Sequence, residues 1–375
     1  MWRRIGGALL TCAAAAALAG CAAATPEITG SWSGLRTLVS ADAPEDPARL
    51  FIIHGMTAQK DDYADVLVKA LETRLRLADN GAAPVDQPYA VSGAIAYGDD
   101  QAYVNLRTYR LYDGRGERLR VSALNWSRLT ESIKNRQFER DDQIPRARVN
   151  GDVKVHVVND GVGDAALYLG KYQAVMRRGV MIGLCAFLEG TFENDGCAPT
   201  ARSNAPVTLI SESLGSYMLL DAIEALNAKA NSAAGKPLFA RLREFYMFAN
   251  QVPLLELADL NPGASRQPLS AEASSRSQRL DAFIERARKF RTADQNEPLQ
   301  IVAFTDPNDL LSYRLSRYLL ANDGAPASSY RAANALYPVA QTYFGFFADP
   351  LKAHTGYAGD AGVLDLVICG SNGCA

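Results

Sequence analysis

The chain has 375 residues, of which 48% are hydrophobic and 21% charged, and its formal net charge is −2. This composition is typical of globular proteins, and the length allows one large domain or two ordinary ones with a substantial core. Neither the charge nor any basic stripe interleaved with aromatic residues points to nucleic acid, so we expect no nucleic-acid partner.

The first twenty residues have the pattern of an export signal. Two arginines precede the uncharged stretch IGGALLTCAAAAALAG, and the end of this stretch, with Cys21, resembles a bacterial lipobox. The resemblance implies a signal peptide over 1–20 and a lipid on Cys21, which would hold the protein at the periplasmic face of the inner or outer membrane. Residues 21–47 are rich in Ala, Pro, Gly and Ser and are interpreted as a tether. An ordinary signal peptide with a coincidental cysteine, or a short membrane anchor, is the alternative.

The main domain, 48–375, begins with an apolar run in 48–57 that predicts a buried strand. The segment 60–81 has helical spacing of its apolar residues and predicts an amphipathic helix. Two strands then flank Asp113-Gly114, a hairpin signal.

The long segment 127–206 separates that hairpin from the next strand. A crossover between parallel strands needs only about a dozen residues, so this segment carries additional structure. It includes a predicted helix over 164–190 and is interpreted as a cap or lid insertion.

Beyond the insertion the pattern is regular, with strands and helices in alternation. Such alternation predicts an α/β fold in which a mostly parallel central sheet is flanked by helices. The predicted strands lie in 205–213, 243–251, 299–305 and 335–347, and the predicted helices over 216–230, 274–290, 311–320 and 359–369.

Four cysteines follow Cys21, and an even number in an exported protein indicates disulfides. Three connectivities can be drawn, and the simplest is local, Cys185 with Cys197 and Cys369 with Cys374. A metal site is the competing interpretation. We expect none, because the cysteines form no C-x-x-C pair and no histidine lies near them.

Ser213 is the candidate nucleophile. It lies in Ser211-Glu212-Ser213-Leu214-Gly215, directly between a predicted strand and a predicted helix. Small residues two positions either side of a serine allow a tight turn that exposes its hydroxyl at a helix N-terminus. The alternative is that Ser213 merely caps the helix.

An acid and a base follow in the order that such a serine requires. Asp309 comes shortly after the strand 299–305 and is the preferred acid, with Asp306 as the alternative. His354 follows the last predicted strand and is the candidate base. His54 is given a structural role, with the N–H groups of Met56 and Leu214 as the two donors of an oxyanion hole; His156 is interpreted as structural or associated with the lid.

The motifs FIIHGM, ISESLGS, FTDPNDLLSY and AHTGY, in this order, resemble the α/β-hydrolase superfamily, and within it bacterial exported esterases and lipases. The resemblance covers about 50–370 and implies Ser213 as nucleophile, Asp309 as acid and His354 as base. Ser211 departs from the usual glycine of the motif.

The sequence therefore predicts a serine hydrolase that cleaves an ester bond through an acyl-enzyme, without a cofactor. Its substrate is open, with lipids and acylated envelope components as candidates, and thioesterase and peptidase activities are not excluded. A non-catalytic binding or scaffold lipoprotein on the same fold is the competing hypothesis. The oligomeric state cannot be derived from the sequence.

Overall fold

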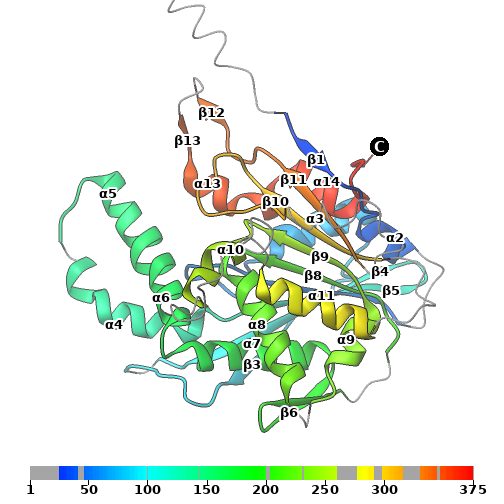
Figure 1. Cartoon of the computed structure of the whole chain (residues 1–375), viewed down its shortest axis with the longest axis horizontal. Coiled ribbons are helices and arrows are strands. Elements are labelled where there is room, and N and C mark those ends of the chain that lie inside the picture. The colour runs from blue at the N-terminus through cyan, green and yellow to red at the C-terminus, as the bar shows by residue number, and fades with distance from the viewer. Residues whose placement is uncertain are drawn as a thin grey trace, which may run out of the picture.

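The computed structural model describes residues 25–40, 46–98, 100–142, 144–199, 203–229, 232–259, 277–290, 298–315, 330–343 and 347–374. The expected signal peptide and Cys21 lie outside these ranges. A large central sheet, most of whose strands are parallel, is covered on both faces by helices (Figure 1). This confirms the predicted fold class.

The main sheet contains nine strands in the spatial order β1-β11-β10-β9-β8-β2-β5-β4-β3. Strands β5, β2, β8, β9, β10 and β11 are parallel to one another, whereas β1, β3 and β4 pair antiparallel with their neighbours. The strands are β1 (Glu27–Thr29), β2 (Ala48–Ile53), β3 (Val85–Ala90), β4 (Tyr103–Asp113), β5 (Gly116–Asn125), β8 (Val207–Glu212), β9 (Leu242–Phe248), β10 (Leu299–Thr305) and β11 (Tyr330–Leu336). Two small hairpins are β6 (Gly190–Glu193) with β7 (Gly196–Pro199) and β12 (Thr342–Tyr343) with β13 (Phe347–Ala348).

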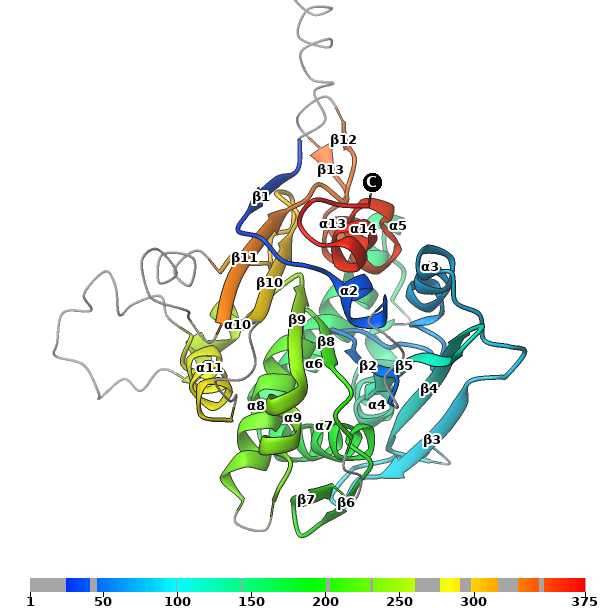
Figure 2. The same ribbon diagram turned by 90° about the vertical axis from the view of Figure 1, so that its right-hand side faces the viewer.

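Helices cover the two faces of the sheet as separate layers (Figure 2). One face packs against α7 (Gln173–Phe187), α8 (Leu214–Ala228), α9 (Gly235–Arg241), α10 (Val252–Leu255) and α11 (Gln278–Phe290). The other packs against α2 (Leu35–Ser40), α3 (Asp65–Leu75) and α14 (Ala361–Cys369). Shorter elements are η1 (Ser127–Leu129), η3 (Glu256–Asp259), α13 (Pro350–Thr355) and η4 (Tyr357–Gly359).

The strand β2 illustrates why the apolar runs of the sequence form a sheet buried on both sides. Phe51 and Ile53 pack in the core under α7 and α8. Leu50 and Ile52, the alternate residues, pack in the core under α3 and α14. Because successive side chains of a strand point to opposite faces, a continuous apolar run is what a central parallel strand requires.

The insertion between β5 and β8 divides into two parts. Helices α4 (Glu131–Asp142), α5 (Arg148–Asp152), η2 (Val153–Val162, a π-helix) and α6 (Gly163–Leu169) project to one side of the sheet (Figure 1). Helix α7 instead packs against β4 and α8. The prediction of a single helix over 164–190 is therefore wrong. Helix α6 ends before Gly170, and helix α7 begins at Gln173.

Part of the predicted tether is folded onto the domain, which corrects the interpretation of 21–47. Strand β1 pairs with β11, and the side chains of Trp32, Leu35 and Val39 are buried. The indole Nε1 of Trp32 donates to the carbonyl oxygen of Leu366 in α14 at 2.9 Å. Residues 27–40 are thus part of the folded domain.

Two further predictions differ from the structure near the C-terminal end of the sheet. The last parallel strand is Tyr330–Leu336, whereas the sequence placed it in 335–347. Its buried residues Ala332-Ala333-Asn334-Ala335 are small and have little apolar bulk to mark a strand. Of the helix predicted over 311–320, residues 311–315 are not helical and the others lie outside the described residues.

Both predicted disulfides are present, Cys185–Cys197 and Cys369–Cys374. The first joins the end of α7 to β7, and the second closes a short loop after α14. Bonds of this kind stabilise mainly by restricting the unfolded chain.

Candidate active site

The predicted site residues lie at one edge of the sheet because of its register. Ile53, the last residue of β2, pairs with Leu124 near the end of β5 and with Ser211 near the end of β8. The loops that begin at the ends of these parallel strands therefore meet at the same edge, where α/β sheets bind their ligands.

Ser213 occupies a sharp turn between β8 and α8. Its backbone has φ 53° and ψ −126°, and its N–H donates to the carbonyl oxygen of Phe248 at 2.8 Å. A positive φ is uncommon for a residue other than glycine and marks local strain. The serine side chain makes no capping hydrogen bond, so the interpretation of Ser213 as a simple helix cap is wrong.

Close packing explains why small residues surround this turn. A Cβ on Gly215 would collide with the carbonyl oxygen of His54, and a Cβ on Gly55 would lie 2.6 Å from that of Ser213. Ser211 fits where a glycine is usual, because its hydroxyl is 2.8 Å from that of Ser216 in α8. The departure from the motif is thus absorbed by a buried hydrogen bond.

His354 joins the serine to an acid. It lies in α13, whose N-terminus is capped by the side chain of Asp349. Its Nε2 is 2.8 Å from Oγ of Ser213, and its Nδ1 is 2.8 Å from Oδ1 of Asp309. Because a carboxylate can only accept, Nδ1–H is the donor to Asp309, and Nε2 is left to accept the serine proton.

The two candidate acids after β10 have different partners. Asp309 contacts His354 and also accepts from the N–H of Leu311 and, at 3.3 Å, from the hydroxyl of Tyr357. Asp306 is turned away, since its carboxylate accepts from the N–H groups of Val339 at 2.6 Å and Ala340 at 2.8 Å. Asp306 therefore fixes the loop after β11, and Asp309 is the carboxylate next to the histidine.

The two predicted oxyanion donors flank the serine. Among the described residues, none accepts a hydrogen bond from the N–H of Met56 or of Leu214. Leu214 is the first residue of α8, where backbone N–H groups have no partner within the helix. Unpaired N–H groups beside a candidate nucleophile are what stabilisation of a developing oxyanion would require.

His54 lies below this loop and has the predicted structural role. Its Nδ1–H donates to the carbonyl oxygen of Gly55 at 2.8 Å, and its Nε2 accepts from the N–H of Trp126 at 3.2 Å. Its ring stacks on the Trp126 indole with centroids 4.8 Å apart. Burial lowers the pKa of His54 to about 4, so the ring is neutral at physiological pH. The third histidine, His156, lies in η2 within the insertion.

A buried ion pair from the insertion holds the loop that carries Met56. Thr57 has φ 83°, and its N–H donates to Oδ2 of Asp164 at 2.9 Å. Oδ1 of Asp164 is 2.8 Å from Nζ of Lys134 and accepts from the hydroxyl of Thr130. The insertion is thus hydrogen-bonded directly to the loop that carries Met56.

Three side chains of the site carry no motif that singles them out. Besides Asp164, Gln251 places its Nε2 3.3 Å from Nε2 of His354. Glu212 precedes the serine, and burial raises its pKa to about 7. Gln251 is the last residue of the predicted strand 243–251, and its place at a strand end is the signal that could have identified it.

The described part of the chain contains neither a clustered set of metal ligands nor a membrane-spanning helix. In the ranges that the structure describes, no group of three or more His, Cys, Asp or Glu side chains is arranged to hold a metal ion. None of the described helices has the length and apolar character needed to span a bilayer.

Comparison with known proteins adds little to this geometry. No protein-family model and no curated protein matches the chain. Among solved structures, the chain is similar to acetyl xylan esterase 1 from Thermoanaerobacterium sp. JW/SL YS485, with 10% sequence identity and a TM-score of 0.24 over 76% of this chain and 89% of that chain. At that level of similarity nothing about chemistry can be transferred.

Proposed function

We propose that the protein is a serine hydrolase that cleaves carboxylic esters, with Ser213 as nucleophile, His354 as base and Asp309 as orienting acid. One observation carries the proposal. The serine hydroxyl, the imidazole and the carboxylate form a continuous hydrogen-bonded chain with both distances at 2.8 Å, and the serine sits on a strained turn that serves no capping purpose.

The mechanism follows from the protonation of these groups. His354 Nε2 takes the proton of Ser213 Oγ as the oxygen attacks the ester carbonyl, and Asp309 stabilises the imidazolium that forms. The N–H groups of Met56 and Leu214 stabilise the tetrahedral oxyanion. The proton then passes to the leaving alcohol, and water, activated by His354, hydrolyses the acyl-enzyme.

Exposed apolar side chains near the site support an acyl substrate of low polarity. Leu310 and Phe347 are 80% and 72% exposed, and they lie within a few residues of Asp309 and His354 in the chain. Val158 and Val162, on η2 of the insertion, are exposed as well. Gly161, between the two valines, packs beside Met56, so exposed apolar side chains lie on segments that carry or contact the site. Such side chains favour a hydrophobic ligand, and lipid or acylated envelope components are the proposed substrate class.

Ester hydrolysis is tested with p-nitrophenyl butyrate and decanoate, alongside a p-nitroanilide of the same acyl groups. We expect both esters to be hydrolysed and Ser213→Ala to lower the rate by at least about 10⁴-fold. The control Ser92→Ala, which changes an exposed serine in a distant turn, should keep full activity. Absence of ester hydrolysis by the folded protein would favour the scaffold hypothesis, and faster cleavage of the anilide would favour a peptidase.

We also propose that the protein is exported and lipid-anchored through Cys21. The support is the apolar segment that ends in Leu18-Ala19-Gly20-Cys21. Metabolic labelling with an alkyne-bearing palmitate analogue should mark the wild type and not Cys21→Ser. Equal labelling of the two would overturn this proposal and leave the catalytic one unaffected.

A further inference from the structure

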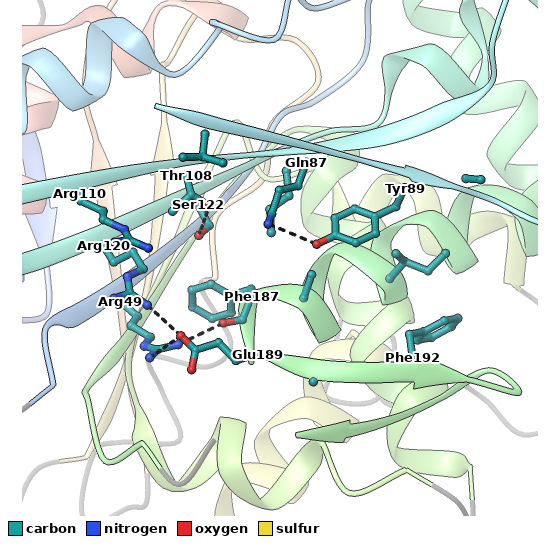
Figure 3. Close-up of a pocket in the computed structure, with 16 residues that line it drawn as sticks. Arg49, Gln87, Tyr89, Thr108, Arg110, Arg120, Ser122, Phe187, Glu189 and Phe192 are labelled. Carbon is teal, nitrogen blue, oxygen red and sulfur yellow. Dashed lines mark hydrogen bonds and ion pairs between the residues drawn. The ribbon is translucent and has the colours of Figure 1, made fainter. Parts of the chain in front are cut away.

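A pocket of about 600 Å³ lies between the β3–β4–β5 side of the sheet and helix α7, and none of the candidate catalytic residues lines it. Its walls are β3, β4 and β5 on one side and the end of α7 with β6 on the other (Figure 3). Arg49, near the amino end of β2, pairs in register with Arg120 of β5. The arginine end of the pocket is therefore separated from the candidate active site by the length of the parallel strands, whereas Leu106, which pairs with Leu124 near the end of β5, lines the pocket at the level of the active-site edge.

One end of this pocket is cationic. The side chains of Arg49, Arg110 and Arg120 gather there (Figure 3). Oε1 of Glu189 is shared by Nη2 of Arg49 at 2.9 Å and Nη1 of Arg120 at 2.8 Å. Arg120 is also paired with Glu117, whereas no described residue pairs with the exposed side chain of Arg110.

The positive charge of this end is incompletely compensated. Arg49 is 4% exposed, and its Nε is buried without a hydrogen-bond partner among the described residues. Burial, and then the charge of Arg49, lowers the pKa of nearby Arg241 to about 10. Buried cationic donors without partners are costly, and an anion would relieve that cost.

The opposite end of the pocket is apolar. Tyr89 and Phe192 lie there, away from the three arginines (Figure 3). The remaining apolar lining comes from Val85, Leu106, Ile182 and Phe187. Gly190 packs against both sulfur atoms of Cys185–Cys197. The covalent link is between α7 and β7, and β6 is held through its pairing with β7. A wall fixed in this way lowers the entropy lost on binding.

We propose that this pocket binds a single-chain amphiphile with an anionic head, either a fatty carboxylate or an alkyl phosphate. The planar guanidinium groups match the paired oxygens of either head, and the apolar end accommodates the chain. The volume lies in the range of known small-molecule sites. This inference does not depend on the reactivity of Ser213, because none of the catalytic candidates lines the pocket.

Isothermal titration of the whole folded protein tests the proposal with four probes below their micelle concentrations: decanoate, decyl phosphate, decanol and inorganic phosphate. We expect at least one of the two anionic amphiphiles to bind, and decanol and inorganic phosphate to bind about tenfold more weakly or worse, since each lacks half of the recognised chemistry. The better of decanoate and decyl phosphate identifies the head group.

Arg110→Gln removes the arginine that has no partner, and we expect it to weaken binding about tenfold or more. Arg115→Gln, which removes the same charge from the exposed β4–β5 turn, is the matched control and should bind as the wild type does. Equal binding by Arg110→Gln and the wild type, equal binding of decanol, or no binding of either anion at 1 mM would overturn the proposal. The first of these outcomes would place any bound amphiphile elsewhere, including at Ser213.

Discussion

His54 and His354 are both buried near the same edge of the sheet, yet their surroundings give them opposite chemistry. His54 is bonded to the Gly55 carbonyl oxygen and the Trp126 N–H and stacks on the indole of Trp126. His354 lies between a serine hydroxyl and a carboxylate. No carboxylate is bonded to His54 among the described residues, and burial lowers its pKa to about 4.

The difference bears on the proposed role of His354 as the base. A buried imidazole without a counter-charge stays neutral and serves as a structural donor and acceptor. One that faces Asp309 can become an imidazolium during the reaction without leaving an uncompensated charge. The hydrogen-bond partners of the imidazole, and not its burial, distinguish a candidate base from a structural histidine.

Exchange of the two histidines for glutamine should give the largest contrast. We expect His354→Gln to lower kcat for p-nitrophenyl esters by about 10⁴–10⁶-fold, because no group remains to accept the serine proton. His54→Gln should act mainly on stability, by about 1–3 kcal/mol, because buried hydrogen bonds are lost. Initial rates and urea unfolding curves of both variants check this. A large loss of kcat in His54→Gln at unchanged stability would contradict the structural role assigned to His54.

The two carboxylates after β10, Asp306 and Asp309, give a second contrast between a structural and a proposed catalytic role. Asp309→Asn should lower kcat by about 10⁴-fold, since an amide cannot stabilise the imidazolium and favours the wrong tautomer. Asp306→Asn should instead lower the free energy of unfolding by about 1–3 kcal/mol, because the N–H groups of Val339 and Ala340 lose a charged acceptor. If Asp306→Asn lost as much kcat as Asp309→Asn with stability unchanged, the assignment of the acid would be reversed.

Much of this site could be derived from the sequence, because parallel strands bring the residues that follow them to one edge. Ser213, Asp309 and His354 each follow an apolar run or lie in a loop beyond it, and their order was informative. Asp164 could not be found in this way. Its partner, the N–H of Thr57, is 107 residues away and belongs to the backbone, which leaves no mark on side-chain patterns.

In the fold, too, elements with a strong local sequence pattern are predicted, and elements that depend on tertiary contacts are not. Strongly apolar strands such as β2 and β10 were identified, whereas β1, with the sequence Glu-Ile-Thr, has no periodicity and forms by pairing with β11. The break between α6 and α7 at Gly170 is not predicted by the sequence, because the apolar residues of both flanking segments have helical spacing. Tertiary contacts decide such elements.

The loop that carries His54 and Met56 is anchored to the insertion by the hydrogen bond from the N–H of Thr57 to Asp164, and this anchor can be removed by substitution. Asp164→Ala should destabilise the protein by about 3–5 kcal/mol, because the buried Lys134 loses its closest carboxylate and keeps only the longer contact with Asp160 at 3.5 Å. The double variant Asp164→Ala/Lys134→Met removes that charge and should recover most of the loss. We expect kcat/KM to stay about 10–10²-fold low in the double variant, because the N–H of Thr57 no longer anchors the oxyanion loop. Full recovery of kcat/KM together with stability would limit Asp164 to a structural role.

The last expected effect is the pH dependence of stability that His54 contributes. Its pKa in the folded protein is about 4, below the value of about 6.5 in an unfolded chain. The unfolded state therefore takes up a proton first, and stability that is complete above pH 6.5 falls by about 3 kcal/mol as the pH drops to 4. The difference in unfolding free energy between wild type and His54→Gln should shrink by that amount over this range. A difference independent of pH would contradict a neutral His54.

The central claim is that Ser213 is an activated nucleophile, and intact-mass spectrometry after reaction with a fluorophosphonate tests it most directly. The account predicts one phosphonyl adduct per chain in the wild type and in Ser92→Ala, located on Ser213, and none in Ser213→Ala. If the folded wild type stays unlabelled while a known serine hydrolase reacts in parallel, or if Ser213→Ala is labelled equally, the account is contradicted.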